Sequence, residues 1–373
     1  MNIPFHRAHI TQDELDLVSD TIKSGWLTMG PKTIEFEKKF KDFIGSKYSI
    51  STNSATSALH LSLNAIGVTS RHEIIVPTNT FVATAEVVAY LGAKPILCDI
   101  DYNTHNIDID QLEKLITSKT KAIIPVHFAG HPCNMDNIIN IAKKYNIYVI
   151  EDAAHALPTT YKNKMIGTIS DITCFSFYAT KTLTTGEGGM LTTNNREIAK
   201  KVKLQRMHGI NSDAWERYGG SNDWYYEVVE LGYKYNITDI QSAIGLVQMK
   251  KILWMKEQRK QIAEVYKNAF RGKINFINEP EFGNSSWHLF VIKVKNRDYL
   301  HKKLKENGIS TSVHFIPIHI HPYYKKKYSY CFDNFPFSNK VFEESLSLPI
   351  YPGLKTNQIQ YIIKNVLKFA KTN

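Results

Sequence analysis

The stretch Ile172–Lys181 reads ITCFSFYATK, and the run GEGG follows it at Gly186–Gly189. Apolar, aromatic and β-branched residues dominate the first stretch, which predicts a buried strand, and the glycines predict a tight turn. A lysine between a buried strand and such a turn is poorly placed for a solvated charge. Burial would lower the pKa of Lys181, and a neutral amine is a nucleophile that can form a Schiff base.

A second strand-like run, Ile147–Ile150, leads directly into Glu151–His155, which reads EDAAH. Asp152 therefore follows one predicted strand as Lys181 follows another. In open α/β sheets, ligands bind at the carboxyl ends of the strands. A carboxylate and a lysine at that edge are the two fixed partners that pyridoxal phosphate needs, one for its ring nitrogen and one for its aldehyde. Asp152 and Lys181 are accordingly the predicted catalytic residues.

The first 240 residues alternate between strand-like and helix-like segments. Such alternation predicts an α/β fold with a mainly parallel sheet and helices on both of its faces. The predicted strands are Glu73–Val76, Pro95–Ile100, Ala122–Val126 and Tyr148–Ile150, and the predicted helices are Phe81–Leu91, Asp110–Ile116 and Met135–Tyr145.

The pattern changes after a long helical segment, Asp239–Phe270, which we expect to link two domains. We predict a large domain at residues 1–245, including the N-terminal segment, and a smaller α+β domain at residues 246–373. In the smaller domain we expect strands at Trp287–Val294 and Ser310–Phe315 and helices at Tyr299–Glu306, Phe342–Leu346 and Gln358–Phe369.

The composition narrows the class of protein. The 373 residues carry a formal net charge of +11, which is compatible with a nucleic acid, an acidic membrane surface or an anionic substrate. The lysines are spread along the chain and the densest run, Lys325–Lys327, is short, so the charge suits a phosphate-bearing small substrate. The chain contains no apolar stretch of about eighteen residues, so we expect no membrane span. The N-terminus lacks a signal-peptide pattern, so we expect a cytoplasmic protein.

Two further features stay open from the residues alone. Asn53–Leu59, NSATSAL, opens a predicted helix whose free N–H groups could hold a phosphate, although an ordinary N-cap is the commoner explanation of such a helix start. His155 could touch a bound ring or be a paired histidine at a helix start. His314, His319 and His321 crowd one segment without a nearby carboxylate or cysteine, so we predict loop histidines, with His314 lining a pocket, and no metal site.

Several motifs that are weak singly are specific together, and the chain resembles the DegT/DnrJ/EryC/StrS family of pyridoxal-phosphate-dependent sugar aminotransferases nearly end to end. The resemblance implies an aspartate-aminotransferase type of fold, with a seven-stranded, mainly parallel sheet, and a homodimer with shared active sites. The matching stretches are Ser24–Pro31, Asn53–Leu61, Pro125–Gly130, Glu151–Ala156, Phe175–Phe177 with Lys181, Gly186–Gly189, Gly232–Gln241 and Trp287–Phe290.

The resemblance also implies roles for residues around the cofactor ring. Lys181 looks like the Schiff-base lysine, and Asp152 looks like the partner of the pyridine nitrogen. Phe81 would stack on the ring and His155 would sit beside it. Members of the family that act as dehydratases carry histidine in place of the lysine, so Lys181 favours transamination over a lyase reaction.

By the same resemblance, Ala55, Thr56 and Ser176 would hold the cofactor phosphate. Ala55 replaces the glycine or cysteine of many relatives, but its backbone N–H is retained. Asn236 would reach the phosphate bound by the neighbouring subunit.

The resemblance implies that glutamate donates the amine and leaves as 2-oxoglutarate. The acceptor would be a keto group, at C4, of a nucleotide-linked keto-deoxysugar, for a surface glycan such as lipopolysaccharide O-antigen or for a secondary metabolite. The candidate substrate contacts are Trp26, Thr28, His208 and His314 by family position, with Arg217 and Lys326 as cations for the diphosphate.

Besides an aminotransferase and a lyase, a third class of function is a regulator that binds nucleic acid. Such a protein would need an added DNA-binding module. The short segment before Trp26 leaves no room for one, and the aromatic residues of Tyr218–Tyr226 lack the interleaved basic residues of a base-stacking surface. We therefore expect those aromatic residues to pack or to form a lid, and we expect no nucleic-acid partner.

Overall fold

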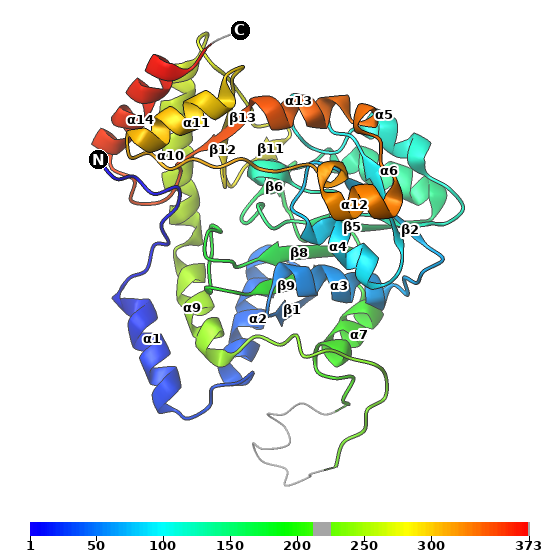
Figure 1. The fold of residues 1–373 in the computed structure, drawn as a ribbon. Helices are drawn as coiled ribbons and strands as arrows, with labels where there is room; N and C mark the ends of the chain where they lie inside the picture. The colour runs from blue at the N-terminus through cyan, green and yellow to red at the C-terminus, as the bar shows by residue number, and fades with distance from the viewer. Residues whose placement is uncertain (212–224, 372–373) are drawn as a thin grey trace.

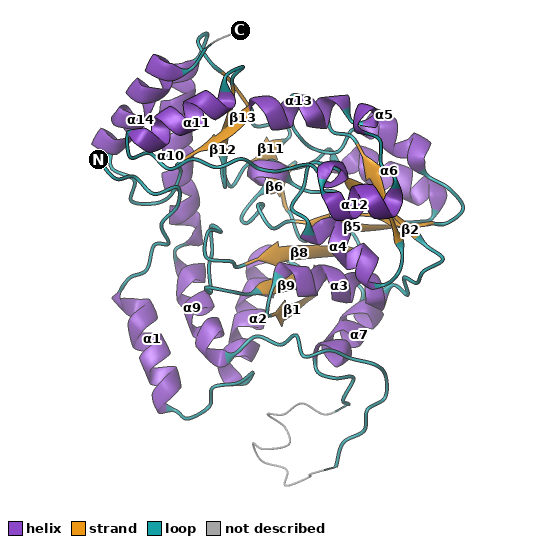
Figure 2. Cartoon of the chain, viewed as in Figure 1, coloured by secondary structure: helices purple, strands orange, loops and turns teal. Residues whose placement is uncertain are grey.

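A central β-sheet organises the structure, a computed structural model that describes residues 1–211 and 225–371. Within these residues, seven strands form the sheet in the order β1-β9-β8-β5-β4-β2-β3 (Figures 1 and 2). Neighbouring strands run parallel except where β9 pairs with β1 and β8, which confirms the predicted α/β class with a mainly parallel sheet. The strands are β1 Tyr48–Thr52, β2 Glu73–Pro77, β3 Lys94–Cys98, β4 Thr120–Ile123, β5 Tyr148–Asp152, β8 Ile172–Ser176 and β9 Gly189–Thr193.

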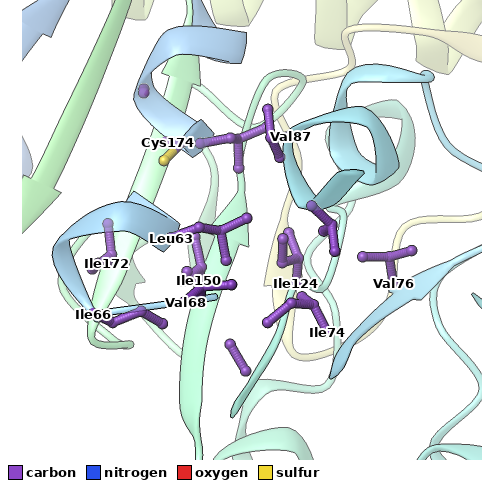
Figure 3. Close-up of a cluster of buried hydrophobic side chains, with 14 of the residues drawn as sticks. Leu63, Ile66, Val68, Ile74, Val76, Val87, Ile124, Ile150, Ile172 and Cys174 are labelled. Atoms are coloured by element: carbon purple, nitrogen blue, oxygen red, sulfur yellow. The ribbon is translucent and has the colours of Figure 1, made fainter. Parts of the chain in front are cut away.

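Both faces of this sheet are buried because successive strand residues point to opposite sides. In β2, Ile74 and Val76 belong to one apolar cluster and Ile75 to the other. Figure 3 shows the first cluster, where side chains from the strands meet Leu63 and Val87 from two covering helices. That face is covered by α3 Ala55–Ala65, α4 Ala83–Tyr90 and α7 Arg196–Arg206, and the other by α2 Pro31–Ile44, α5 Ile109–Leu112 and α6 Met135–Tyr145.

Two consecutive helices connect the sheet to the C-terminal part of the chain, as Figure 1 shows. The predicted long helix is α9 Asp239–Lys250 followed by α10 Ile252–Phe270, with Lys251 between them in a non-helical conformation. The C-terminal core is built on a small sheet whose described strands have the order β10-β12-β13. Its elements are β10 Asn275–Phe276, β12 Phe290–Lys293, α11 Arg297–Glu306, β13 Ser345–Leu348 and α14 Thr356–Phe369.

The first residues of the chain also pack on this C-terminal core. Ile3 is fully buried in the same cluster as Phe290 and forms a bridge with Ile309. The domain boundary near residue 245 stays a prediction. The remaining elements are α1 Gln12–Lys23, β6 Thr160–Tyr161, β7 Lys164–Met165, β11 Gly283–Asn284, α12 Pro322–Tyr328 and α13 Pro336–Glu344, with 3-10 turns at Glu113–Leu115, Phe128–Gly130, Ile318–Ile320 and Phe332–Asn334. None of the described helices is long and apolar enough to cross a membrane.

Two predictions for the C-terminal part are wrong. Ser310–Phe315 is not a strand: Ser312 alone bridges to Ser347, because the chain then crosses to the seven-stranded sheet, where the Phe315 N–H donates to Asn79 after β2. The predicted helix at Phe342–Leu346 is the end of α13 and the start of β13. The alternation Ser-Leu-Ser-Leu at residues 345–348 has the two-residue period of a strand and correctly indicates β13.

The apolar run predicted that Lys181 directly follows a strand. This is wrong, because β8 ends at Ser176. The following residues form a loop that returns to the sheet. The loop is closed at its base by bonds from Phe177 N–H to the Gly188 carbonyl and from Thr185 N–H to the Phe177 carbonyl. Lys181 is therefore held on a short, closed loop between β8 and β9.

Asp239 at the start of α9 joins this helix to the start of α2, which is distant in the sequence. Its buried carboxylate accepts bonds from the N–H groups of Gly30, Lys32 and Thr33 at the start of α2 and from the Thr33 hydroxyl. We expect Asp239→Ala to lower the free energy of unfolding by about 2 to 4 kcal/mol, because several bonds to a charged group are lost. Denaturant unfolding measures this loss, Asp239→Asn should lose less, and an unchanged unfolding midpoint in Asp239→Ala would contradict the assignment.

Candidate active site

A cavity of about 570 Å³ opens at the carboxyl edge of the parallel strands. Its floor carries Asp152 from the end of β5 and Ser176 from the end of β8, and its roof comes from Leu289, Ser312 and Phe315 of the C-terminal part. The cavity thus lies between the large sheet and the C-terminal part of the chain. It brings together the predicted residues Ala55, Thr56, Phe81, Asp152, His155, Ser176, Lys181 and His314.

Lys181 is an unusual amine inside this cavity. Burial lowers the pKa of Lys181 to about 8, and the nearby Asp152 carboxylate opposes the shift only in part. Throughout residues 1–211 and 225–371, Nζ has no hydrogen-bond or ion-pair partner. About a tenth of this amine is therefore neutral at pH 7, far more than for an exposed lysine, and this form is open to an electrophile such as an aldehyde.

Asp152 is held in a fixed orientation by two donors. The Thr84 hydroxyl donates to Oδ2 at 2.8 Å and the Ala154 N–H donates to Oδ1 at 3.1 Å. Burial raises the pKa of Asp152, while both of these bonds and the charge of Lys181 favour the ionised form. The carboxylate can therefore face a cationic group in the cavity with its rotamer already set.

Thr84, which no motif in the sequence indicated, should contribute to cofactor binding and turnover through its bond to Asp152. We expect Thr84→Val to weaken cofactor binding and to lower turnover by roughly tenfold or more, because a hydrogen bond to a charged group is lost. Thr84→Ser keeps the hydroxyl and should stay close to the native protein. Spectrophotometric titration with pyridoxal phosphate and steady-state rates check this, and equal values for the valine and serine variants would contradict it.

A buried polar network lies behind Asp152. His127 Nδ1 accepts the Cys133 N–H at 3.0 Å, so the proton of this imidazole is on Nε2, which donates to Glu151 at 2.7 Å. Glu151 also accepts the hydroxyls of Ser170 and Thr173. The main-chain N–H of His127 in turn donates to the main-chain carbonyl of Asp152. These bonds fix the backbone that presents Asp152, and the sequence showed only that Glu151 and His127 lie in matching motifs.

The start of α3 forms the other end of the cavity. The Ser54 hydroxyl caps the helix by accepting the Ser57 N–H at 3.1 Å. In the part of the chain that the structure describes, the N–H groups of Ala55 and Thr56 have no acceptor, and both residues line the cavity. Gly189 packs so closely that a Cβ there would lie 2.5 Å from the Ser54 carbonyl. This helix start is therefore capped by Ser54, and the N–H groups of Ala55 and Thr56 are also free to donate to a phosphate.

These features fit pyridoxal phosphate. The group needs donors for its phosphate, a carboxylate for its ring nitrogen and an amine for its aldehyde, and all three line one cavity. Phe81 is 58% exposed on the cavity wall and contacts Phe315 at 5.9 Å between ring centroids, so its face is available to a planar ring. His155 stacks on Phe315 at 5.9 Å, beside the same space.

Other predicted substrate contacts lie apart from this cavity. Trp26 and Thr28 belong to the segment before α2, where the Trp26 indole donates to the Met29 carbonyl and the Thr28 carbonyl accepts the Asp239 N–H. His208 is exposed after α7, and Lys326 is exposed on α12. Arg217 lies outside the described residues. The roles of these five residues stay predictions.

Asn236 does not line the cavity of its own chain. Its side-chain amide donates to the Ile237 carbonyl, and the preceding Tyr235 carbonyl accepts the Asn53 N–H. Its predicted contact with the phosphate of a neighbouring subunit is not tested by a single chain. His319, predicted as a loop histidine, is instead buried between Thr78 and Asn339, with both ring nitrogens in hydrogen bonds.

Comparison with known proteins identifies the family. Residues 8–367 match the model of the DegT/DnrJ/EryC1/StrS aminotransferase family. The chain is 44% identical to the spore coat polysaccharide biosynthesis protein SpsC of Bacillus subtilis, over 99% of this chain and 97% of that protein.

Solved structures agree with this match. The PLP form of Spr1654 from Streptococcus pneumoniae is 34% identical, with a TM-score of 0.92 over 99% of this chain and 98% of that one. Helicobacter pylori PseC, an aminotransferase involved in pseudoaminic acid biosynthesis, is 30% identical, with a TM-score of 0.92 over 99% of both chains. The chain therefore belongs to the DegT/DnrJ/EryC1/StrS aminotransferase family, whose enzymes use pyridoxal phosphate.

Proposed function

We propose that this sugar aminotransferase transfers an amino group from glutamate to the C4 keto group of a nucleotide-linked keto-deoxysugar. The observation that carries the proposal is the pairing of a partly neutral lysine, Lys181, with the buried carboxylate of Asp152 in one cavity. This pair suits an aminotransferase better than a lyase, since the resemblance associates loss of the lysine with dehydration.

Each group in the cavity has a physical task. When bound, pyridoxal phosphate supplies an electron sink for the carbon that gains or loses the amine. The N–H groups of Ala55 and Thr56, with the Ser176 hydroxyl, would bind its phosphate at the helix start. Asp152 would keep the ring nitrogen protonated through a charge-assisted hydrogen bond. Lys181 Nζ would accept the proton from the donor Cα and release it again within the first half of the reaction. In the second half it would deliver a proton to the sugar carbon that gains the amine.

The acceptor assignment is supported by two kinds of resemblance. Two of the named relatives act in polysaccharide and pseudoaminic acid biosynthesis, which are pathways of sugar chemistry. The segments His208–Tyr226 and Gly308–Phe315 look most like family members that aminate C4. A formal charge of +11 is compatible with a substrate that carries a diphosphate. A role in surface-glycan synthesis such as O-antigen, a homodimer with shared active sites and a cytoplasmic location belong to the same proposal.

A substrate panel tests the proposal. The loaded enzyme is incubated with glutamate and with UDP-, dTDP- or GDP-linked 4-keto and 3-keto sugars, and products are identified by mass and NMR. We expect an aminated 4-keto sugar and one equivalent of 2-oxoglutarate. A dehydrated sugar without 2-oxoglutarate would show a lyase, and amination of the 3-keto sugars alone would reject C4. Reactions without glutamate and with Lys181→Ala are the controls.

A further inference from the structure

Four histidines surround the reactive end of the cavity. His6, His155, His288 and His314 all line it with Lys181, and they come from four separate parts of the chain. The acidic residues among the described lining side chains are Asp152 and Glu187, and Lys181 is the one lysine or arginine among them. Burial lowers the pKa of His6 and of His314 to about 3, with the charge of Lys181 as a further cause. These two rings are therefore neutral at neutral pH, each with one donor and one acceptor nitrogen.

Part of the hydrogen-bonding capacity of these rings is not used by the described residues. His155 is 7% exposed and His288 is 5% exposed, yet across residues 1–211 and 225–371 their ring nitrogens have no hydrogen-bond partner. His6 Nε2 is also buried without a partner among the described residues. His314 is oriented by a bond of 2.9 Å between Nδ1 and the Ser347 hydroxyl, which leaves Nε2 available. Buried polar nitrogens without partners are costly, so their convergence indicates a ligand that forms hydrogen bonds.

A buried cation behind the wall strengthens this indication. Arg259 is 1% exposed, and its guanidinium donates to the carbonyl oxygens of His288 at 3.2 Å and Ile350 at 2.7 Å. It has no carboxylate partner in the described part of the chain. Its positive charge therefore acts directly behind His288, and a negative group in front of His288 would be stabilised.

The position of the cluster decides which anion fits. In an amino acid, the α-carboxylate and the amino group are attached to the same carbon. A donor whose amine reacts next to Lys181 therefore places its carboxylate near Nζ, in the part of the cavity whose histidines interact electrostatically with Lys181. The diphosphate of a nucleotide-linked sugar is separated from C4 by the sugar ring and reaches less easily into this end of the cavity.

We propose that His288 and His314, with His6 beside them, bind the α-carboxylate of the amino donor. The proposal rests on the proposed aminotransferase function and adds its donor subsite. His155 is left out because its ring stacks on Phe315 beside the cofactor space. The imidazole N–H groups donate to the carboxylate oxygens, and no bond is made or broken in this binding step.

Binding of glutarate, an unreactive dicarboxylate, tests the subsite on the cofactor-loaded protein. Calorimetry with His288→Gln and His314→Gln should show affinities for glutarate weakened roughly ten- to a hundredfold, while the affinity for UDP stays within about twofold. His131→Gln is the matched control, because His131 is 1% exposed and has an unpartnered Nδ1 but does not line the cavity. Its affinity for glutarate should be unchanged.

A second measurement avoids any loss of folding in the variants. In the native protein labelled with 13C at its histidines, glutarate should shift the ring NMR signals of two or three of the 14 histidines, and UDP should not shift them. Unchanged glutarate affinity in both cavity variants would overturn the proposal, as would histidine signals that ignore glutarate. Weaker UDP binding with normal glutarate binding would assign the cluster to the nucleotide. If the sugar panel fails while glutarate behaves as expected, the acceptor is wrong and the donor subsite stands.

Discussion

Replacing Lys181 with alanine is expected to abolish turnover, with a loss of at least about ten-thousandfold. A positioned general base alone contributes up to about that factor, and Lys181 would also hold the cofactor aldehyde covalently. The structure leaves Nζ without a partner among the described residues and lowers its pKa to about 8, so the amine is ready for both tasks. Steady-state rates and the visible absorbance of bound cofactor measure the two effects separately.

The fold should survive this substitution, because removal of an amine whose burial is costly does not destabilise the protein. Lys181→Ala should therefore keep the native melting temperature while its visible cofactor band is lost. Lys302→Ala, an exposed position on α11, is the matched control and should retain full activity. A Lys181→Ala protein that keeps both the absorbance band and its turnover would remove the basis of the proposed chemistry.

Asp152→Asn is expected to lower turnover by about a hundred- to a thousandfold, the usual effect of removing one preorganised electrostatic group. Asparagine has nearly the same shape and can still accept a bond from Thr84 or Ala154, so the cavity should be preserved. What is lost is the negative charge that keeps the ring nitrogen of the cofactor protonated. Rates must be compared at full cofactor loading, measured by absorbance.

Asp171→Asn provides a control at the opposite end of the same strand. The Asp171 carboxylate accepts the Val149 N–H at 2.9 Å, near the start of β5 and away from the cavity. This variant tests whether loss of a carboxylate bonded to β5 matters in itself, and its activity should stay within a few-fold of native. Near-native turnover in fully loaded Asp152→Asn would count against the electron-sink role of the carboxylate.

Much of the fold was predictable because its signals are local. Helix α6 has the predicted bounds, and β2, β5, α11 and α14 lie within two residues of them. Alternating and helical periods in the sequence report directly on which side chains are buried. The failures, at Ser310–Phe315 and Phe342–Leu346, occur where hydrogen bonds to distant residues decide the backbone, as between Phe315 and Asn79.

Motifs of contiguous residues in the sequence determined the family and the α/β class, and they predicted the catalytic pair Asp152 and Lys181. Only the tertiary structure showed that Thr84 orients Asp152, that His127 supports the strand end, and that His6, His288 and His314 meet beside Lys181. Those residues are far apart along the chain and belong to no shared motif. Their proximity results from burial of both faces of the sheet and docking of the C-terminal part, which no local pattern encodes.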